Sequence, residues 1–298
     1  MLTGIHFLLT YACTSECDHC FVFSSPRATG TFTLDQIAQV LAQAADLGTV
    51  DAVYFEGGEP FLYYPLMLEG IRLARDLGFK TGVVTNAYFA TTVQDAMLWL
   101  RPLRDLGISD LSLSDDAFHF DTPDNAAKRA LEAAKLLDLP VGTICIEMPR
   151  VATEPGAREK GAPIVGGNVM FRGRAAEKLT EGLPRQDWRR FTECPHEDLR
   201  NPERVHVDAF GWVHLCQGLC MGNLWEKPLA ALVREYSPDA HPVVGPLVRG
   251  GPTRLAEEYR LPHAEGYADA CHLCYSMRLA LTDRFPDLLA PRQVYVRE

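Results

Sequence analysis

An Asp-Leu-Gly tripeptide recurs at nearly constant intervals along the first half of the chain. Its three copies and a related Asp-Leu-Pro stand at residues 46–48, 76–78, 105–107 and 138–140. Each closes a stretch in which apolar residues recur at i, i+3, i+4 and i+7, as do Leu34, Ile37, Ala38 and Leu41. Since glycine and proline end helices, the repeat predicts four helices around residues 34–41, 67–74, 93–100 and 127–134.

The starts of two of these helices also carry sequence signals. Thr33 and Gln36 have the spacing of a capping box, with Phe32 and Ile37 placed as a hydrophobic staple. Thr122-Pro123 would put proline at the first position of the fourth helix.

Short apolar runs lie before and between these helices and predict strands. They cover residues 5–10, 52–55, 81–85, 110–114, 141–146 and 164–170. Strands that alternate with helices form a parallel sheet with right-handed crossovers, so the fold class is α/β. Five or six units are too few for a closed eight-fold barrel. We therefore expect a partial (βα)6 TIM-like barrel with ligands at the C-terminal ends of its strands.

The sequence pattern changes after the repeat. Residues 149–167 are rich in Pro, Gly and Glu, which predicts a loop over the mouth of the barrel. From about residue 182 the repeat is lost, and only short strands at 205–208 and 212–215 and a helix near 272–284 are indicated. We expect a core domain at 1–181 and a smaller region at 182–298.

Composition narrows the classes of partner. A net charge of −10 without a basic block disfavours a nucleic-acid groove. No apolar run is long enough to span a bilayer, and no basic segment precedes residues 2–10, so neither a membrane anchor nor a signal peptide is expected. Nine cysteines without a secretion signal favour a reducing cytoplasm and metal ligation over disulfides.

Three of these cysteines follow the first strand. Cys13, Cys17 and Cys20 are spaced C-x3-C-x2-C, and thiolate sulfur suits iron–sulfur clusters and zinc. Three thiolates would leave one iron of a [4Fe–4S] cluster free to bind another ligand. A structural zinc loop is the alternative.

This spacing resembles the radical S-adenosylmethionine (SAM) superfamily. The resemblance implies a cluster whose open iron chelates SAM and whose electron cleaves it to a 5′-deoxyadenosyl radical. Gly57-Gly58-Glu59 stands where the superfamily has its GGE motif, which a zinc loop would not need. His19 stands where the family usually has an aromatic residue.

The resemblance also implies SAM contacts at the strand ends. Glu59, or the backbone around it with Gly57 and Gly58, would hold the SAM amino group. Alternation along the fourth strand sends Ser112 and Ser114 to one face. The predicted contacts to SAM come from Asn86, Ser112, Ser114 and Asp115.

Candidate proton acceptors follow the fourth and fifth strands. A buried carboxylate whose pKa was raised could take a proton from the substrate, and this role is predicted for Asp116, His119 or Glu147. Glu147 would face the barrel interior, whereas Cys145 is expected to be a buried thiol without a ligand role.

The C-terminal cysteines form a second pattern. Cys194, the segment Gly211-x4-Cys216, and the pair Cys271 and Cys274 resemble the twitch or SPASM extension that binds auxiliary clusters. The resemblance implies one auxiliary [4Fe–4S] cluster on these four cysteines, with zinc as the alternative. Cys220 is left as a replacement ligand, a thiol near the site or a buried residue.

We therefore expect a radical SAM oxidoreductase that receives electrons from a donor such as flavodoxin or ferredoxin. Its relatives modify ribosomal peptides or oxidise small alcohols such as aminocyclitols, and peptide or protein modification is ranked slightly first. The cluster loop begins at residue 13, so we expect no leader-recognition domain before it. A non-catalytic iron–sulfur carrier and a zinc-stabilised binding module are the alternatives from other classes.

Overall fold

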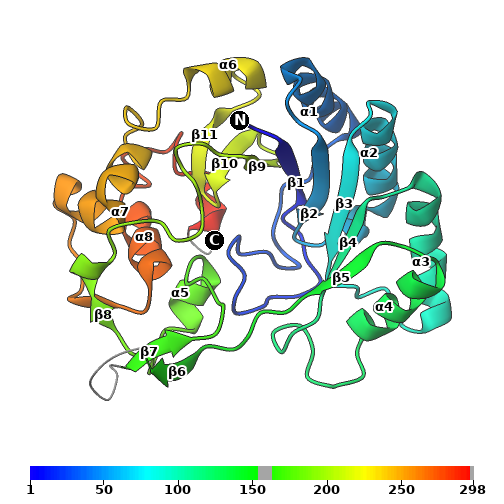
Figure 1. Ribbon diagram of the computed structural model, residues 1–298, viewed down its shortest axis with the longest axis horizontal. Helices are drawn as coiled ribbons and strands as arrows, with labels where there is room; N and C mark the ends of the chain where they lie inside the picture. The colour runs from blue at the N-terminus through cyan, green and yellow to red at the C-terminus, as the bar shows by residue number, and fades with distance from the viewer. Residues whose placement is uncertain (154–162, 296–298) are drawn as a thin grey trace.

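The computed structural model describes residues 1–153 and 163–295, and its central feature is one sheet of eight strands. The strand order is β11-β10-β9-β1-β2-β3-β4-β5. The parallel strands are β1 (Gly4–Thr10), β2 (Ala52–Gly57), β3 (Lys80–Thr85), β4 (Asp110–Ser114), β5 (Val141–Ile144) and, on the other side of β1, β9 (Arg204–Asp208). The antiparallel strands are β10 (Trp212–Cys216) and β11 (Leu219–Asn223). Figure 1 shows the sheet curving around the loop that follows β1.

The four predicted helices are confirmed and cover the outer side of the parallel strands (Figure 1). They are α1 (Leu34–Leu47), α2 (Tyr64–Asp76), α3 (Val93–Leu106) and α4 (Ala126–Leu136). Thr33 and Gln36 form the predicted capping box, and Gly48 and Gly107 end their helices in the left-handed conformation. The predicted start of α4 at residues 122–123 is wrong, because the Asn125 side chain caps the helix by accepting the Lys128 N–H.

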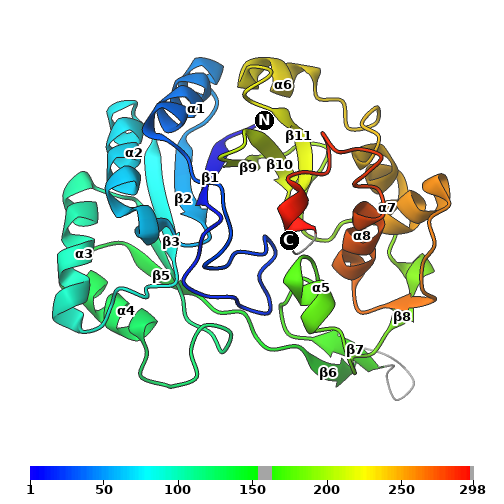
Figure 2. The same ribbon diagram turned by 180° about the vertical axis from the view of Figure 1, so that it is seen from behind.

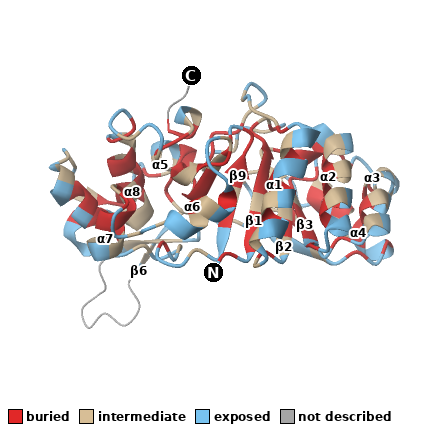
Figure 3. Ribbon diagram, turned by 90° about the horizontal axis from the view of Figure 1, so that it is seen from above, coloured by how far each residue is buried: buried red, intermediate tan, exposed pale blue. Residues whose placement is uncertain are grey.

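The helices pack on one face of the sheet and leave the other face for the site. Phe7 and Phe55 stack with their ring centroids 5.1 Å apart, and Ile37 of α1 is fully buried. Because successive side chains of a strand alternate between faces, His6 and Glu56 point to the inner side. Figure 3 shows the buried residues running through the strands and the inward sides of the helices.

The strand predicted at residues 164–170 does not join the parallel sheet, so this prediction is wrong. β7 (Pro163–Gly166) instead pairs antiparallel with β6 (Arg150–Thr153) in a separate hairpin. Gly167 has φ of +101°, which ends this strand after four residues. The predicted loop at 149–167 is therefore partly a hairpin, and residues 154–162 lie outside the described part of the chain.

The second half of the chain extends the same sheet. The predicted strands at 205–208 and 212–215 are confirmed, and β9 pairs with β1 in the register His6 to His206. The remaining elements are η1 (Pro60–Tyr63), α5 (Arg174–Lys178), β8 (Gln186–Asp187), η2 (Trp188–Arg190), α6 (Leu229–Glu235), α7 (Val244–Tyr259), β12 (Gly266–Tyr267), α8 (Ala270–Leu279) and η3 (Arg292–Val294). The reverse view in Figure 2 shows α7 and α8 grouped on the side opposite α3 and α4. Within residues 1–153 and 163–295, no helix has the length and apolar character needed to cross a membrane.

Candidate functional site

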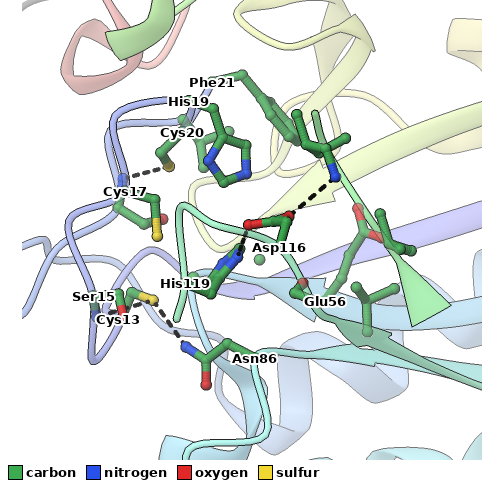
Figure 4. Close-up of a pocket in the computed structure, with 18 of the residues that line it drawn as sticks. Cys13, Ser15, Cys17, His19, Cys20, Phe21, Glu56, Asn86, Asp116 and His119 are labelled. Carbon is green, nitrogen blue, oxygen red and sulfur yellow. Dashed lines mark hydrogen bonds and ion pairs between the residues drawn. The ribbon is translucent and has the colours of Figure 1, made fainter. Parts of the chain in front are cut away.

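The loop after β1 carries three cysteines into a cavity of about 260 Å³ at the C-terminal ends of the strands. Cys13, Cys17 and Cys20 all line this cavity and all have free thiols (Figure 4). The Ser15 N–H points to Cys13 Sγ at 3.5 Å, and the Ser24 N–H points to Cys20 Sγ at 3.3 Å. Three thiols on one cavity, with N–H donors directed at two of the sulfurs, fit an iron–sulfur cluster.

The start of α5 fixes the cysteine loop in place. Arg174 is buried, and its guanidinium donates to the Cys17 carbonyl at 2.7 Å and to the Ser24 carbonyl at 2.8 Å. Its own N–H donates to the Cys20 carbonyl at 2.9 Å. These three hydrogen bonds satisfy loop carbonyls that would otherwise be buried without donors.

Gly57 and Gly58 allow the end of β2 to pass close to this loop. A Cβ atom on Gly58 would lie 2.1 Å from the Ala12 carbonyl oxygen, and Gly57 has φ of +131°. The Gly58 N–H donates to the Thr10 carbonyl at 2.6 Å. Both glycines line the cavity, and their close contact with Thr10 and Ala12 joins the end of β2 to the cysteine loop.

Of the two alternatives predicted to hold SAM, the backbone of Gly57 and Gly58 lines the cavity, whereas the Glu59 side chain lies outside it. This side chain is fully buried and accepts hydrogen bonds from Thr85 Oγ1 at 2.7 Å, the Asn86 N–H at 2.8 Å and the Phe61 N–H at 3.0 Å. Burial raises the pKa of Glu59 to about 7. Its role in the fold is to join the ends of β2 and β3.

The structure divides the other predicted SAM contacts into two groups. Asn86 and Ser114 line the cavity, and Asn86 Nδ2 donates to Thr14 Oγ1 at 3.0 Å. Ser112 shares a strand face with Ser114, as predicted, but its hydroxyl donates to Asp110 outside the cavity. Asp115 also lies outside, because its carboxylate accepts the Asn125 side-chain amide at the start of α4.

Asp116 and His119 form a pair on the cavity wall. Asp116 Oδ1 and His119 Nδ1 are 2.8 Å apart, and Asp116 Oδ2 accepts the Ile146 N–H at 3.2 Å (Figure 4). Burial opposes ionisation of Asp116, but the hydrogen bond and charge of His119 outweigh it and lower its pKa. Asp116 is therefore a weak base that orients His119.

His19 completes the polar side of this wall. Its ring lies 5.3 Å from that of His119, centroid to centroid, and its Nδ1 is buried without a hydrogen-bond partner in the described residues. Burial, and then the charge of His119, lower the pKa of His19 to about 4. It is therefore neutral near neutral pH.

The expectations for Glu147 and Cys145 are wrong. The Glu147 side chain is 59% exposed and lies 3.6 Å from the Arg150 guanidinium. Cys145 is exposed rather than buried. Strand β5 ends at Ile144, so the alternation that would turn Glu147 inward stops before reaching it.

The four C-terminal cysteines converge on a second, smaller cavity of about 30 Å³. Its thiols belong to Cys194, Cys216, Cys271 and Cys274. Two buried arginines, Arg172 and Arg278, line the same space. The Arg172 Nη1 donates to Cys216 Sγ at 2.8 Å, and the Nε atoms of both arginines are buried without acceptors in the described residues.

This donor set fits a metal cluster. Burial raises the pKa of the Cys274 thiol to about 11 and also raises those of Cys194 and Cys271, so these thiols would release protons on binding metal. The two guanidinium groups would offset half of the negative charge of four thiolates. Arg172 also lines the first cavity and therefore lies between the two sites.

Cys220 lies outside both cavities and is fully buried, which agrees with the alternative in which it is a buried residue without a ligand role. Its Sγ donates to the Ala290 carbonyl at 3.3 Å and lies 3.7 Å from His214 Nδ1. His214 in turn contacts Asp208, which accepts the Tyr11 hydroxyl at 2.8 Å. This network joins the cysteine loop to the β10–β11 hairpin.

Residues 7–146, which contain the first cavity's cysteines, match the sequence model of the Radical SAM superfamily. The chain contains a radical SAM domain. A putative peptide biosynthesis protein, YydG of Bacillus subtilis, is 24% identical over 107 residues, which cover 36% of this chain and 34% of that protein. A putative glycyl-radical enzyme activating enzyme of Methanocaldococcus jannaschii is 30% identical over 90 residues, covering 30% of this chain and 34% of that protein. The chain thus matches about a third of the length of these two relatives.

The fold of the radical SAM domain and much of the remaining chain also resembles a solved structure. BtrN, crystallised in complex with AdoMet and 2-DOIA, superposes with a TM-score of 0.52 at 15% identity. The match covers 78% of this chain and 82% of BtrN. At this identity the likeness concerns the fold alone.

Three further residues have positions of functional interest that were not predicted from the sequence. Glu56 lines the first cavity, Arg172 lines both cavities, and Arg174 holds the cysteine loop. Glu56 directly precedes Gly57-Gly58, and its position on an inward strand face could have been read from alternation. The arginines contact residues more than forty positions away, so no local pattern marks them.

Proposed function

We propose that this protein is a radical SAM enzyme with an auxiliary [4Fe–4S] cluster that modifies a peptide or protein. The observation that carries the proposal is the arrangement of three thiols on one cavity and four on a second, with Arg172 on the walls of both. Cys13, Cys17 and Cys20 would hold the SAM-binding cluster. The auxiliary cluster would bind to Cys194, Cys216, Cys271 and Cys274.

The first cluster, when bound, supplies the electron that cleaves SAM to a radical able to abstract hydrogen from substrate. The chain's own residues would bind SAM and exclude water. Gly57 and Gly58 would offer backbone to the bound molecule with no side chain between them, and Asn86 and Ser114 offer polar groups in the same cavity.

His119 is the proposed acceptor of a substrate proton. Its Nδ1 faces Asp116 at 2.8 Å, which favours the tautomer with the proton on that nitrogen. Nε2 would then carry the free lone pair. Asp116 stabilises the imidazolium that forms, as a buried carboxylate does beside a catalytic histidine.

A third hollow favours a substrate longer than a small metabolite. It measures about 540 Å³ and shares Asn168 and Val169 with the first cavity and His196 with the second. It runs beside β7, and a peptide chain could lie in it while one residue entered the first cavity. The peptide biosynthesis name of the B. subtilis relative supports the same class.

Dehydrogenation of a small alcohol is the second candidate, because the BtrN fold covers 78% of the chain. A non-catalytic iron–sulfur carrier or a zinc-stabilised module would not cleave SAM. The test is 5′-deoxyadenosine formation by anaerobically reconstituted, dithionite-reduced protein, alone and with peptides encoded beside its gene. Stimulation by a peptide, together with a mass change in it, is expected. A product formed only from added aminocyclitols would support the second candidate.

A further inference from the structure

A group of possible metal ligands, separate from both sets of cysteines, lies on the inner face of the sheet. His6 on β1, Glu56 on β2 and His206 on β9 come from three adjacent strands. β1 and β9 place His6 directly opposite His206, and Glu56 pairs with Leu8 one inward position further along. Figure 4 shows Glu56 on the opposite side of the cavity from Cys13 and Cys17.

The ligand atoms of this group are close enough to share one ion. Glu56 Oε2 lies 3.1 Å from His6 Nδ1, and Glu56 Oε1 lies 2.9 Å from His206 Nε2. One donor atom from each of the three residues lies within 4.8 Å of the other two. Ligands at about 2.1 Å from a metal ion and at right angles to each other are roughly 3 Å apart.

Of the three residues, Glu56 lines the first cavity, and His6 and His206 do not. The side chains of His6, Glu56 and His206 are 14%, 16% and 13% exposed, and Glu56 is part of the cavity wall. The wall of this cavity includes the apolar residues Leu8, Val84, Ile144 and Ile146, together with polar residues such as Ser114 and Asp116. A carboxylate buried against such a wall needs a cation or several donors to stabilise it.

We propose that His6, Glu56 and His206 bind one divalent first-row metal ion, such as Mn²⁺ or Fe²⁺, beside the first cavity. Two imidazoles and one carboxylate with open positions are the ligand set typical of such ions. Each imidazole would carry its proton on the nitrogen that faces away from the metal. The open positions would take an oxygen or nitrogen of the substrate.

This proposal is independent of the auxiliary cluster and of SAM cleavage. The test is a titration of anaerobically reconstituted, desalted enzyme with Mn²⁺, in which EPR measures the free ion. Mn²⁺ prefers oxygen and nitrogen ligands to thiolate, so it does not compete for the cysteines. Saturable binding of one ion per chain is expected in the wild-type protein.

Two variants and one control place the ion. His206→Gln keeps a hydrogen-bond donor toward Glu56 but removes a ligand, and with Glu56→Gln it should weaken binding at least ~10-fold. Asp116→Asn alters the other His and Asp group on the same cavity and should leave Mn²⁺ binding unchanged. Iron content and thermal melting check that each variant is folded.

Two results would overturn the proposal. One is the absence of saturable Mn²⁺ binding by the wild-type enzyme up to ~1 mM. The other is binding that His206→Gln leaves unchanged or that Asp116→Asn abolishes. Either would make the three side chains a hydrogen-bonded network or a direct contact for substrate.

Discussion

Replacing Arg172 by glutamine should lower the reduction potential of the proposed auxiliary cluster. The guanidinium is buried, and its Nη1 donates to Cys216 Sγ at 2.8 Å. A positive charge stabilises the reduced cluster, which carries one more electron than the oxidised cluster. Arg172→Gln removes that charge while keeping a polar amide on a shorter side chain.

The size of the effect follows from Coulomb's law. With roughly 7 Å between the guanidinium and the added electron and an effective dielectric constant of about 20, the interaction is about 2.4 kcal/mol, or about 100 mV for one electron. Glu197 Oε1 lies 3.8 Å from the Arg172 guanidinium and offsets part of this charge. We therefore expect a decrease of about 50–100 mV.

The assay is a potentiometric titration followed by EPR, on enzyme whose iron and sulfide contents match those of the wild type. Arg189→Gln is the control, because Arg189 is 62% exposed and pairs with Asp187 away from the cavities. A change below ~20 mV for Arg172→Gln, or an increase in potential, would refute this electrostatic role. Reduced iron content would instead show that Arg172 is required for cluster assembly.

Three further predictions concern the radical SAM cavity. Gly58→Ala places a Cβ atom 2.1 Å from the Ala12 carbonyl oxygen and should lower the free energy of unfolding by about 1–3 kcal/mol, as measured by thermal or urea unfolding. Gly142→Ala is the control and should be near neutral, because no atom lies within 4 Å of the added Cβ. Because the pKa of Glu59 is raised in the folded protein, the free energy of unfolding should fall by about 3 kcal/mol as pH rises from about 4.5 to about 7. Glu59→Gln should flatten this pH dependence. An unchanged slope in the variant would exclude Glu59 as its source. His119→Gln should lower the rate of product formation about 100-fold or more. Asp116→Asn should lower this rate less and shift its pH profile. Equal activity of the wild type and both variants would contradict the proton-transfer role of His119.

The helices and most of the parallel sheet could be predicted because their signals are local. Periodic apolar residues and the capping box at Thr33 depend on neighbours in sequence, and the structure has both. The sixth strand could not be predicted in this way, because Gly167 and the pairing of β6 with β7 decide its course. The pairing of β9 with β1 joins residues 200 positions apart and leaves no local trace.

The cysteines of the site were predictable from spacing, but the directions of side chains beyond the strand ends were not. Alternation correctly put Ser112 and Ser114 on one face. Past the last strand residue it no longer applies, so Asp115 turns to Asn125 and Glu147 turns to solvent. Asp115 and Glu147 pair with residues ten and three positions away, so the course of the loops after the strands decides these orientations.

The central claim is that two separate sets of cysteines hold two clusters and that only one of them cleaves SAM. Iron, sulfide and 5′-deoxyadenosine should be measured for the wild-type enzyme and for a variant with alanine at Cys13, Cys17 and Cys20. We predict about eight irons per wild-type chain, falling to about four in the variant, with SAM cleavage lost. About four irons together with bound zinc in the wild type, or undiminished SAM cleavage by the variant, would contradict the account.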